Sequence, residues 1–118
     1  MKLSEHQRIF TFNISKLINY AYMNDMELTF GEARRTNEQQ LIYFQTGKSK
    51  TMRSNHLRAL AVDFNLFIKG ELTYKWEDVK LLGDYWETLH PANRWGGDWN
   101  KNDIKDGFID APHFEMNI

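Results

Sequence analysis

The chain contains no cysteine and no long apolar segment. Without cysteine it forms neither disulfides nor thiolate metal sites, so any metal site must be built from His, Asp and Glu. A membrane-spanning helix needs about 20 consecutive apolar residues, and no stretch of this sequence approaches that length. Residues 1–10 are mostly polar where a signal peptide would be apolar. We therefore expect synthesis in a cytoplasm, no signal peptide and no insertion into a membrane.

An excess of charge of either sign is also absent, because 15 Lys and Arg residues nearly balance 16 Asp and Glu residues. The charges are mixed along the chain, so no global field favours nucleic acid as a partner. With 118 residues the chain can bury one core but is too short for a catalytic domain plus a folded accessory domain. We expect a single domain covering residues 1–118 that acts as a monomer.

The spacing of apolar residues indicates the secondary structure. Two segments show helical spacing, and residues 36–39 (TNEQ) have the form of a capping box that opens a third helix. The predicted helices are 5–25, 36–47 and 76–89, and the predicted strands are 28–33, which should enter the core, 61–68 and 111–118. Residues 46–54 are a predicted loop, and residues 93–102 are rich in Gly, Asn and Trp. This order predicts an α+β fold in which helices pack on a small antiparallel sheet.

Three polar residues on separate segments are candidates for a metal site. Asp63 lies in the otherwise apolar strand 61–68, where a carboxylate is costly unless it is exposed, paired or bound to a metal. His56 precedes it, and His113 follows Pro112, which excludes a regular helix there. Two imidazoles and one carboxylate are the usual protein ligands of a catalytic zinc ion, with water in the fourth position. On residue types alone, a structural His–Asp pair is the alternative.

Four motifs extend this candidate site. Residues 54–63 (SNHLRALAVD) resemble the S-x-H-x-x-G-x-A-x-D signature of the zinc D-alanyl-D-alanine carboxypeptidases and the phage L-alanyl-D-glutamate endopeptidases. Residues 95–99 (WGGDW) resemble the W-G-G-D-W segment of the same superfamily. Residues 110–115 (DAPHFE) and 35–40 (RTNEQQ) resemble its acid-x-x-His-Phe-Glu and R-[ST]-x-x-x-Q segments. The motifs occur in the family's order and cover most of the chain.

The sequence departs from the family pattern at two positions. Ala59 stands where the family usually has glycine, and alanine would strain the loop by about 1 kcal/mol if that position has positive φ. The path of the chain before the strand at 61–68 would then differ from the path in the family. Asp110 stands where the carboxypeptidase branch has glutamate, whereas the phage endopeptidase branch commonly has aspartate. The second departure favours the endolysin branch.

The resemblance implies a zinc enzyme that hydrolyses amide bonds, with His56, Asp63 and His113 as the metal ligands. A carboxylate must take a proton from the attacking water and pass it to the leaving amine. By family position this base is Asp110. Glu115 is the rival base, but we expect it to orient a ligand imidazole, since on a strand it shares a face with His113.

The resemblance also implies a substrate pocket. We expect Arg35 to stabilise the oxyanion or to bind a substrate carboxylate, and Ser54 to line the pocket. Asp98 either supports a metal ligand through a hydrogen bond or forms a structural turn. We interpret Trp95 and Trp99 as core and pocket wall rather than as platforms for sugar stacking.

The implied function is a phage-type endolysin that cuts the L-alanyl-D-glutamate bond of the peptidoglycan stem peptide. Such a lysin accumulates in the host cytoplasm and acts on the cell wall after release, in keeping with the missing signal peptide and wall-binding domain. One alternative is a D,D-carboxypeptidase that releases terminal D-alanine. Another is a zinc-containing virion domain that binds wall peptide without cleaving it, although a pure binder needs no general base.

Overall fold

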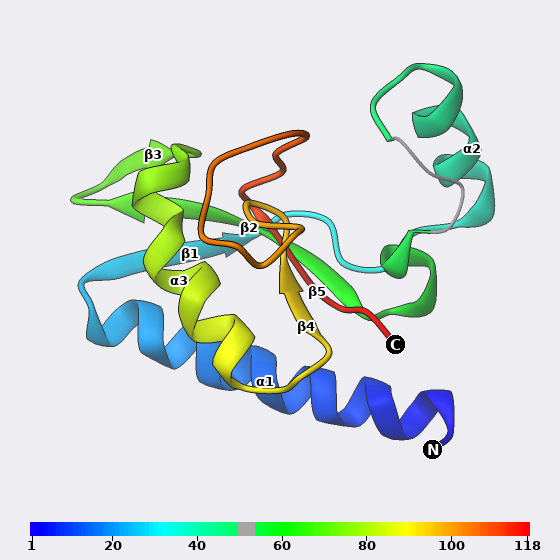
Figure 1. Ribbon diagram of the computed structural model, residues 1–118, viewed down its shortest axis with the longest axis horizontal. Coiled ribbons are helices and arrows are strands. Elements are labelled where there is room, and N and C mark those ends of the chain that lie inside the picture. The colour runs from blue at the N-terminus through cyan, green and yellow to red at the C-terminus, as the bar shows by residue number, and fades with distance from the viewer. Residues whose placement is uncertain (50–53) are drawn as a thin grey trace.

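The structure of the chain, a computed structural model, describes residues 1–49 and 54–118 (Figure 1). In chain order the elements are α1 (Leu3–Met23), β1 (Met26–Phe30), α2 (Asn37–Gln45), the short 3₁₀ helix η1 (Asn55–Arg58), β2 (Ala61–Ile68), β3 (Glu71–Thr73), α3 (Trp76–Thr88), β4 (Asn93–Trp95) and β5 (His113–Met116). The sheet has the order β1-β2-β5-β4, with β3 also paired to β2, and every pairing is antiparallel. The predicted α+β class is confirmed. No helix within the described ranges is long and apolar enough to cross a membrane.

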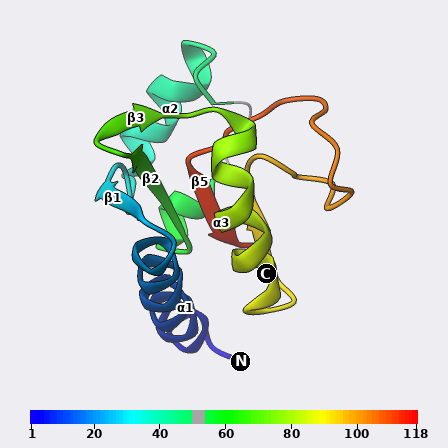
Figure 2. The ribbon, with the colours of Figure 1, turned by 90° about the vertical axis from the view of Figure 1, so that its left-hand side faces the viewer.

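The core lies where α1 and α3 meet the sheet. Trp86 of α3 is fully buried, and its ring contacts Phe10 of α1 and Phe114 of β5 edge to face. Phe64 of β2 packs on the same side of the sheet as Phe114. Because side chains alternate along a strand, Asp63 and His113 lie on the opposite face of the sheet. Figures 1 and 2 show α2 standing apart from α1 and α3.

The three predicted helices and the strand at 61–68 are confirmed, but several details of the sheet differ. The strand expected at 28–33 is β1, which runs from Met26 to Phe30 at the edge of the sheet. Its residues Met26 and Leu28 pack against the core, whereas Phe30 is 68% exposed. The three-residue strands β3 and β4 were not predicted, because such short segments show no alternation to recognise. Of the loop predicted at 46–54, residues 50–53 lie outside the described ranges.

Trp95 explains why α3 contains a glycine. A glycine inside a helix costs about 1 kcal/mol relative to alanine, yet a Cβ at Gly83 would overlap the indole ring of Trp95. A Cβ at Gly97 would overlap the same ring. The fully buried indole donates a hydrogen bond from Nε1 to the carbonyl oxygen of Ala111, at 2.7 Å. The ring thus joins α3 and β4 to the segment that leads into β5.

Ala59 has the positive φ that its family position suggested. It ends η1 with φ 53° and ψ 38°, in the left-handed region, and its N–H donates to the carbonyl oxygen of His56. An L-residue in this conformation is strained by roughly 1–2 kcal/mol because its Cβ approaches the following carbonyl oxygen. The chain therefore keeps the left-handed turn before β2 and carries the strain.

Ala59→Gly should raise the stability of the protein by about 1 kcal/mol, because glycine adopts positive φ without this strain. The expected shift in melting temperature is roughly 4 °C, measured by thermal unfolding at fixed metal concentration. Ala92→Gly is the control, because Ala92 has negative φ and packs against the core, so this change should lower the melting temperature. An unchanged or lower melting temperature for Ala59→Gly would contradict the strain.

Candidate active site

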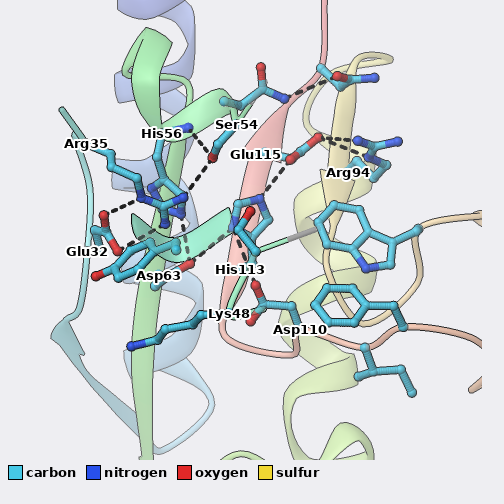
Figure 3. Close-up of a pocket in the computed structure, with 17 residues that line it drawn as sticks. Glu32, Arg35, Lys48, Ser54, His56, Asp63, Arg94, Asp110, His113 and Glu115 are labelled. Atoms are coloured by element: carbon cyan, nitrogen blue, oxygen red, sulfur yellow. Dashed lines mark hydrogen bonds and ion pairs between the residues drawn. The ribbon is translucent and has the colours of Figure 1, made fainter. Parts of the chain in front are cut away.

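The pairing of β2 with β5 brings the central residues of the site together. Asp63 of β2 lies directly opposite His113 of β5, so their side chains project from the same face. His56 comes from η1, just before β2, and the hydroxyl of Ser54 caps this short helix by accepting from the N–H of His56 at 3.2 Å. Figure 3 shows His56 and His113 on either side of Asp63.

Three ligand atoms converge at this point. His56 Nε2 lies 3.3 Å and His113 Nδ1 lies 3.1 Å from Asp63 Oδ1, and one ligand atom from each residue lies within 4.8 Å of the others. Ligand atoms at about 2.1 Å from a tetrahedral zinc ion are about 3.4 Å apart. The two imidazoles and the carboxylate could therefore hold a metal ion with small adjustments.

In each imidazole, the outer nitrogen, which faces away from Asp63, already has a hydrogen-bond partner. His56 Nδ1 donates to the carbonyl oxygen of Ala33 at 2.6 Å, since a carbonyl oxygen can only accept. His113 Nε2 lies 2.8 Å from Glu115 Oε1 and donates to that carboxylate. These bonds turn Nε2 of His56 and Nδ1 of His113 toward Asp63. Outer-nitrogen bonds to a carbonyl or a carboxylate are the usual support of metal-binding histidines.

The charges at this point favour a cation. Burial would raise the pKa of Asp63, but hydrogen bonds from His113 and His56 outweigh it and lower the pKa to about 2. Burial would lower the pKa of His113, yet its hydrogen bonds to Asp63 and Glu115 raise the pKa to about 9. Two ionised carboxylates therefore stabilise positive charge between them. A bound metal ion would provide that charge in place of a proton.

The two acidic residues near His113 have different surroundings. Burial raises the pKa of Asp110, whose Oδ2 lies 4.0 Å from His113 Nδ1 and whose side chain is 38% exposed. Burial would also raise the pKa of Glu115, but the hydrogen bond to His113 and the charges of His113 and Arg94 lower it. Glu115 is thus an anion whose carboxylate is bound by both His113 and Arg94. Asp110 is better placed to take up and release a proton.

Gly96 fixes Asp110 relative to His113. Its N–H donates to the carbonyl oxygen of His113 at 2.7 Å, and its own carbonyl oxygen accepts from the N–H of Asp110 at 2.8 Å. A Cβ at this position would overlap the carbonyl oxygen of Asp110 and crowd the Cβ of His113. The glycine in the WGGDW motif therefore allows the close backbone approach that holds the acid beside the histidine.

Arg35 is built into the pocket wall. Its guanidinium donates to both carboxylate oxygens of Glu32, at 2.5 and 3.0 Å, to Gln40 at 2.5 Å and to Ser54 at 3.2 Å. Its side chain is 8% exposed, and the guanidinium stacks on the Tyr43 ring at 4.8 Å. Across the described ranges these bonds use four of the five N–H groups of the guanidinium, so one N–H group has no acceptor there.

A pocket of about 560 Å³ surrounds the cluster and is lined by Arg35, Ser54 and Trp99 among others. Trp99 lies with its ring 5.2 Å from that of His113, whereas Trp95 is in the core. Asp98 accepts from the N–H groups of Asn102 and Asp103, at 3.1 and 2.8 Å. These two bonds hold the loop that follows Asp98.

Sequence reasoning missed Glu32, Tyr43 and Arg94, which also line the pocket. Arg94 pairs with Glu115, and its Nη2 lies 2.7 Å from Glu115 Oε2. It lies on β4, where no strand was predicted, so its register against β5 was not foreseen. Glu32 and Arg35 are three residues apart on an irregular segment, where spacing carries no periodic signal.

Comparison with solved structures shows the same fold in two peptidases. The crystal structure of the L-Ala D-Glu endopeptidase ChiX of Serratia marcescens matches with a TM-score of 0.67 and 24% identity, over 97% of this chain and 85% of that one. A variant of the vancomycin resistance D,D-pentapeptidase VanY of a VanB-type cassette, solved in complex with Zn(II), matches with a TM-score of 0.58 and 18% identity, over 91% and 70%.

Comparison of sequences identifies the family. An L-alanyl-D-glutamate peptidase of Listeria phage A118 is 35% identical over 106 residues, which cover 86% of this chain. The chain spans about a third of the length of that relative, of which 34% is matched. Residues 13–117 match the family described as phage L-alanyl-D-glutamate peptidase. The chain therefore belongs to the phage L-alanyl-D-glutamate peptidase family.

Proposed function

We propose that this chain is a zinc-dependent peptidase that cuts the L-alanyl-D-glutamate bond of peptidoglycan stem peptides. The observation that carries the proposal is the convergence of His56 Nε2, His113 Nδ1 and an Asp63 carboxylate oxygen within 4.8 Å of one another. Membership of the family supports the choice of substrate. The cell wall would be the place of action, reached after release from the host cytoplasm.

The donor set fits zinc. Two neutral imidazoles and one carboxylate, with a fourth position open to the pocket, are a typical catalytic zinc environment. Both imidazoles have their outer nitrogens fixed by Ala33 and Glu115, which supports binding through the inner ones. A zinc ion held there would supply a coordinated water with a pKa near 7 and would polarise the scissile carbonyl.

The side chains around this point would share the remaining work. Asp110 is our candidate for the general base, because burial raises its pKa and it lies beside His113. It takes a proton from the attacking water and passes it to the leaving amine of the D-glutamyl residue. Glu115 holds the ring of His113 rather than transferring protons. The remaining N–H of Arg35 points to a role in stabilising negative charge on the scissile carbonyl oxygen.

The reaction is tested by mass spectrometry of digested peptidoglycan. We expect fragments with a free D-glutamyl amino group, one equivalent of zinc per chain, and loss of activity with a chelator. His56→Ala should lose both metal and activity, because it removes one of three protein ligands. His90→Ala is the matched control and should keep both, since His90 follows α3 and bonds to the N–H of Ala92. Release of free D-alanine without cleavage at D-glutamate would instead identify a D,D-carboxypeptidase.

Asp110→Asn separates metal binding from chemistry. The amide keeps the shape of the side chain but cannot carry the proton, so we expect normal zinc content and stability with a loss of activity of at least about 10²-fold. Asp106→Asn in the same loop is the control, because Asp106 is exposed and should tolerate the change. Full activity in Asp110→Asn would transfer the role of base to Glu115.

Arg35 is tested by asking which kinetic constant changes. If its guanidinium stabilises charge on the scissile carbonyl oxygen, Arg35→Ala should lower kcat by about 10²–10³-fold, as loss of an oxyanion donor does. Arg35→Lys should restore little of the lost kcat, because lysine keeps the positive charge but lacks the guanidinium N–H groups that bind Glu32 and Gln40. Arg34→Ala is the control and should change neither constant. A rise in KM with unchanged kcat would show instead that Arg35 binds a ground-state carboxylate.

A further inference from the structure

We propose that Arg94 is a positioning residue of the metal site, acting on His113 through Glu115. The inference rests on the proposed function, since it concerns how a metal ligand is held. Arg94 lies on β4 and its register partner is Glu115 on β5, so both side chains project from the face that carries His113. Figure 3 shows Arg94, Glu115 and His113 in sequence along one side of the pocket.

The carboxylate of Glu115 divides its two oxygens between two partners. Oε2 accepts from Nε and Nη2 of Arg94, at 3.0 and 2.7 Å. Oε1 accepts from Nε2 of His113 at 2.8 Å. Because Arg94 binds one oxygen through two N–H groups, rotation of the carboxylate is restricted and the other oxygen stays aimed at the imidazole. The orientation of the His113 ring therefore depends on the guanidinium.

Arg94 itself is held from a second side. Its guanidinium lies over the ring of Trp99, 4.8 Å from the centroid, and the Trp99 ring lies 5.2 Å from that of His113. The side chain of Glu115 is 5% exposed whereas that of Arg94 is 31% exposed. A buried carboxylate is costly unless a cation compensates it. Arg94 thus places a positive charge against the buried Glu115 carboxylate and reaches it from the pocket wall.

The consequence is specific to one ring nitrogen. With Nε2 of His113 bound to Glu115, Nδ1 is directed at Asp63, 3.1 Å away. If Glu115 lost its anchor, the imidazole could turn about χ2 and Nδ1 would no longer be fixed toward the metal position. Arg94 needs no contact with substrate for this role, so its loss should weaken metal binding rather than only the chemical step.

The test is zinc affinity, measured by competition with a chromogenic chelator. Arg94→Gln should weaken zinc binding by about 10-fold, the lower end of the effect of losing an outer partner of a metal-binding histidine. Arg94→Lys keeps the positive charge but lacks the planar guanidinium with its two parallel N–H groups. Its zinc affinity should fall between that of Arg94→Gln and that of the wild type. Arg58→Gln is the matched control, because it removes an exposed positive charge close in sequence to His56 and should leave zinc affinity unchanged.

A double-mutant cycle decides whether Arg94 acts through Glu115. Glu115→Gln alone should weaken zinc binding, and adding Arg94→Gln to it should cause little further loss if the two residues form one chain of contacts. Thermal unfolding in the absence of zinc checks that each variant folds. Unchanged zinc affinity in Arg94→Gln would overturn the inference. So would a double variant whose fold-loss of zinc affinity equals the product of the two single fold-losses.

The outcomes also separate this inference from the proposed function. A wild-type chain that binds zinc but cleaves no stem peptide would overturn the proposed function and leave the affinity cycle as a valid test of Arg94. A wild-type chain that cleaves stem peptides, with Arg94→Gln binding zinc as tightly, would overturn the role of Arg94 alone. A wild-type chain that binds no zinc would overturn both.

Discussion

Asp63 and His113 lie directly opposite each other in the pairing of β2 with β5, and the rest of the site is arranged around this register. The same pairing sets Ala61 against Glu115, and the next pairing sets Glu115 against Arg94. A slip of one residue would move alternate side chains to the opposite face. His113 would then enter the core and Phe114 would enter the pocket. The apolar alternation of β2, with Phe64 and Leu66 buried against the helices, opposes such a slip.

The charged side chains of the site compensate one another in a row. Their charges alternate in sign along a chain of contacts, with 2.7 to 3.1 Å between neighbours, in the order Asp63, His113, Glu115 and Arg94. Isolated charges at this depth would be strongly destabilising, whereas hydrogen-bonded pairs are tolerated. Asp110 stands beside this row rather than in it, and its ion pair with His113, at 4.0 Å, is the one that the described residues give it. The arrangement thus separates the residues that hold charge from the one suited to exchanging a proton.

Sequence alone predicted the parts of this site that carry local patterns. The alternation of residues 61–68 marked Asp63 as a polar residue in an apolar strand. The family motifs around His56 and His113 then singled out the same three residues that converge in the structure. The contribution of Arg94 was not predictable in this way, because β4 is only three residues long and its pairing with β5 joins positions 21 apart. The bonds of Asp98 likewise depend on the turn of the following loop, which no periodicity describes.

The packing of Trp95 between two glycines restricts how this protein can be engineered. Replacing a helical glycine by alanine is a common way to raise thermostability, and Gly83 is a glycine inside α3. Its new methyl group would overlap the indole, and so would one at Gly97. A smaller aromatic residue at position 95 would make room, but it would give up the hydrogen bond to Ala111, two residues before His113. Libraries aimed at a more heat-resistant variant should therefore vary these three positions together or leave them fixed.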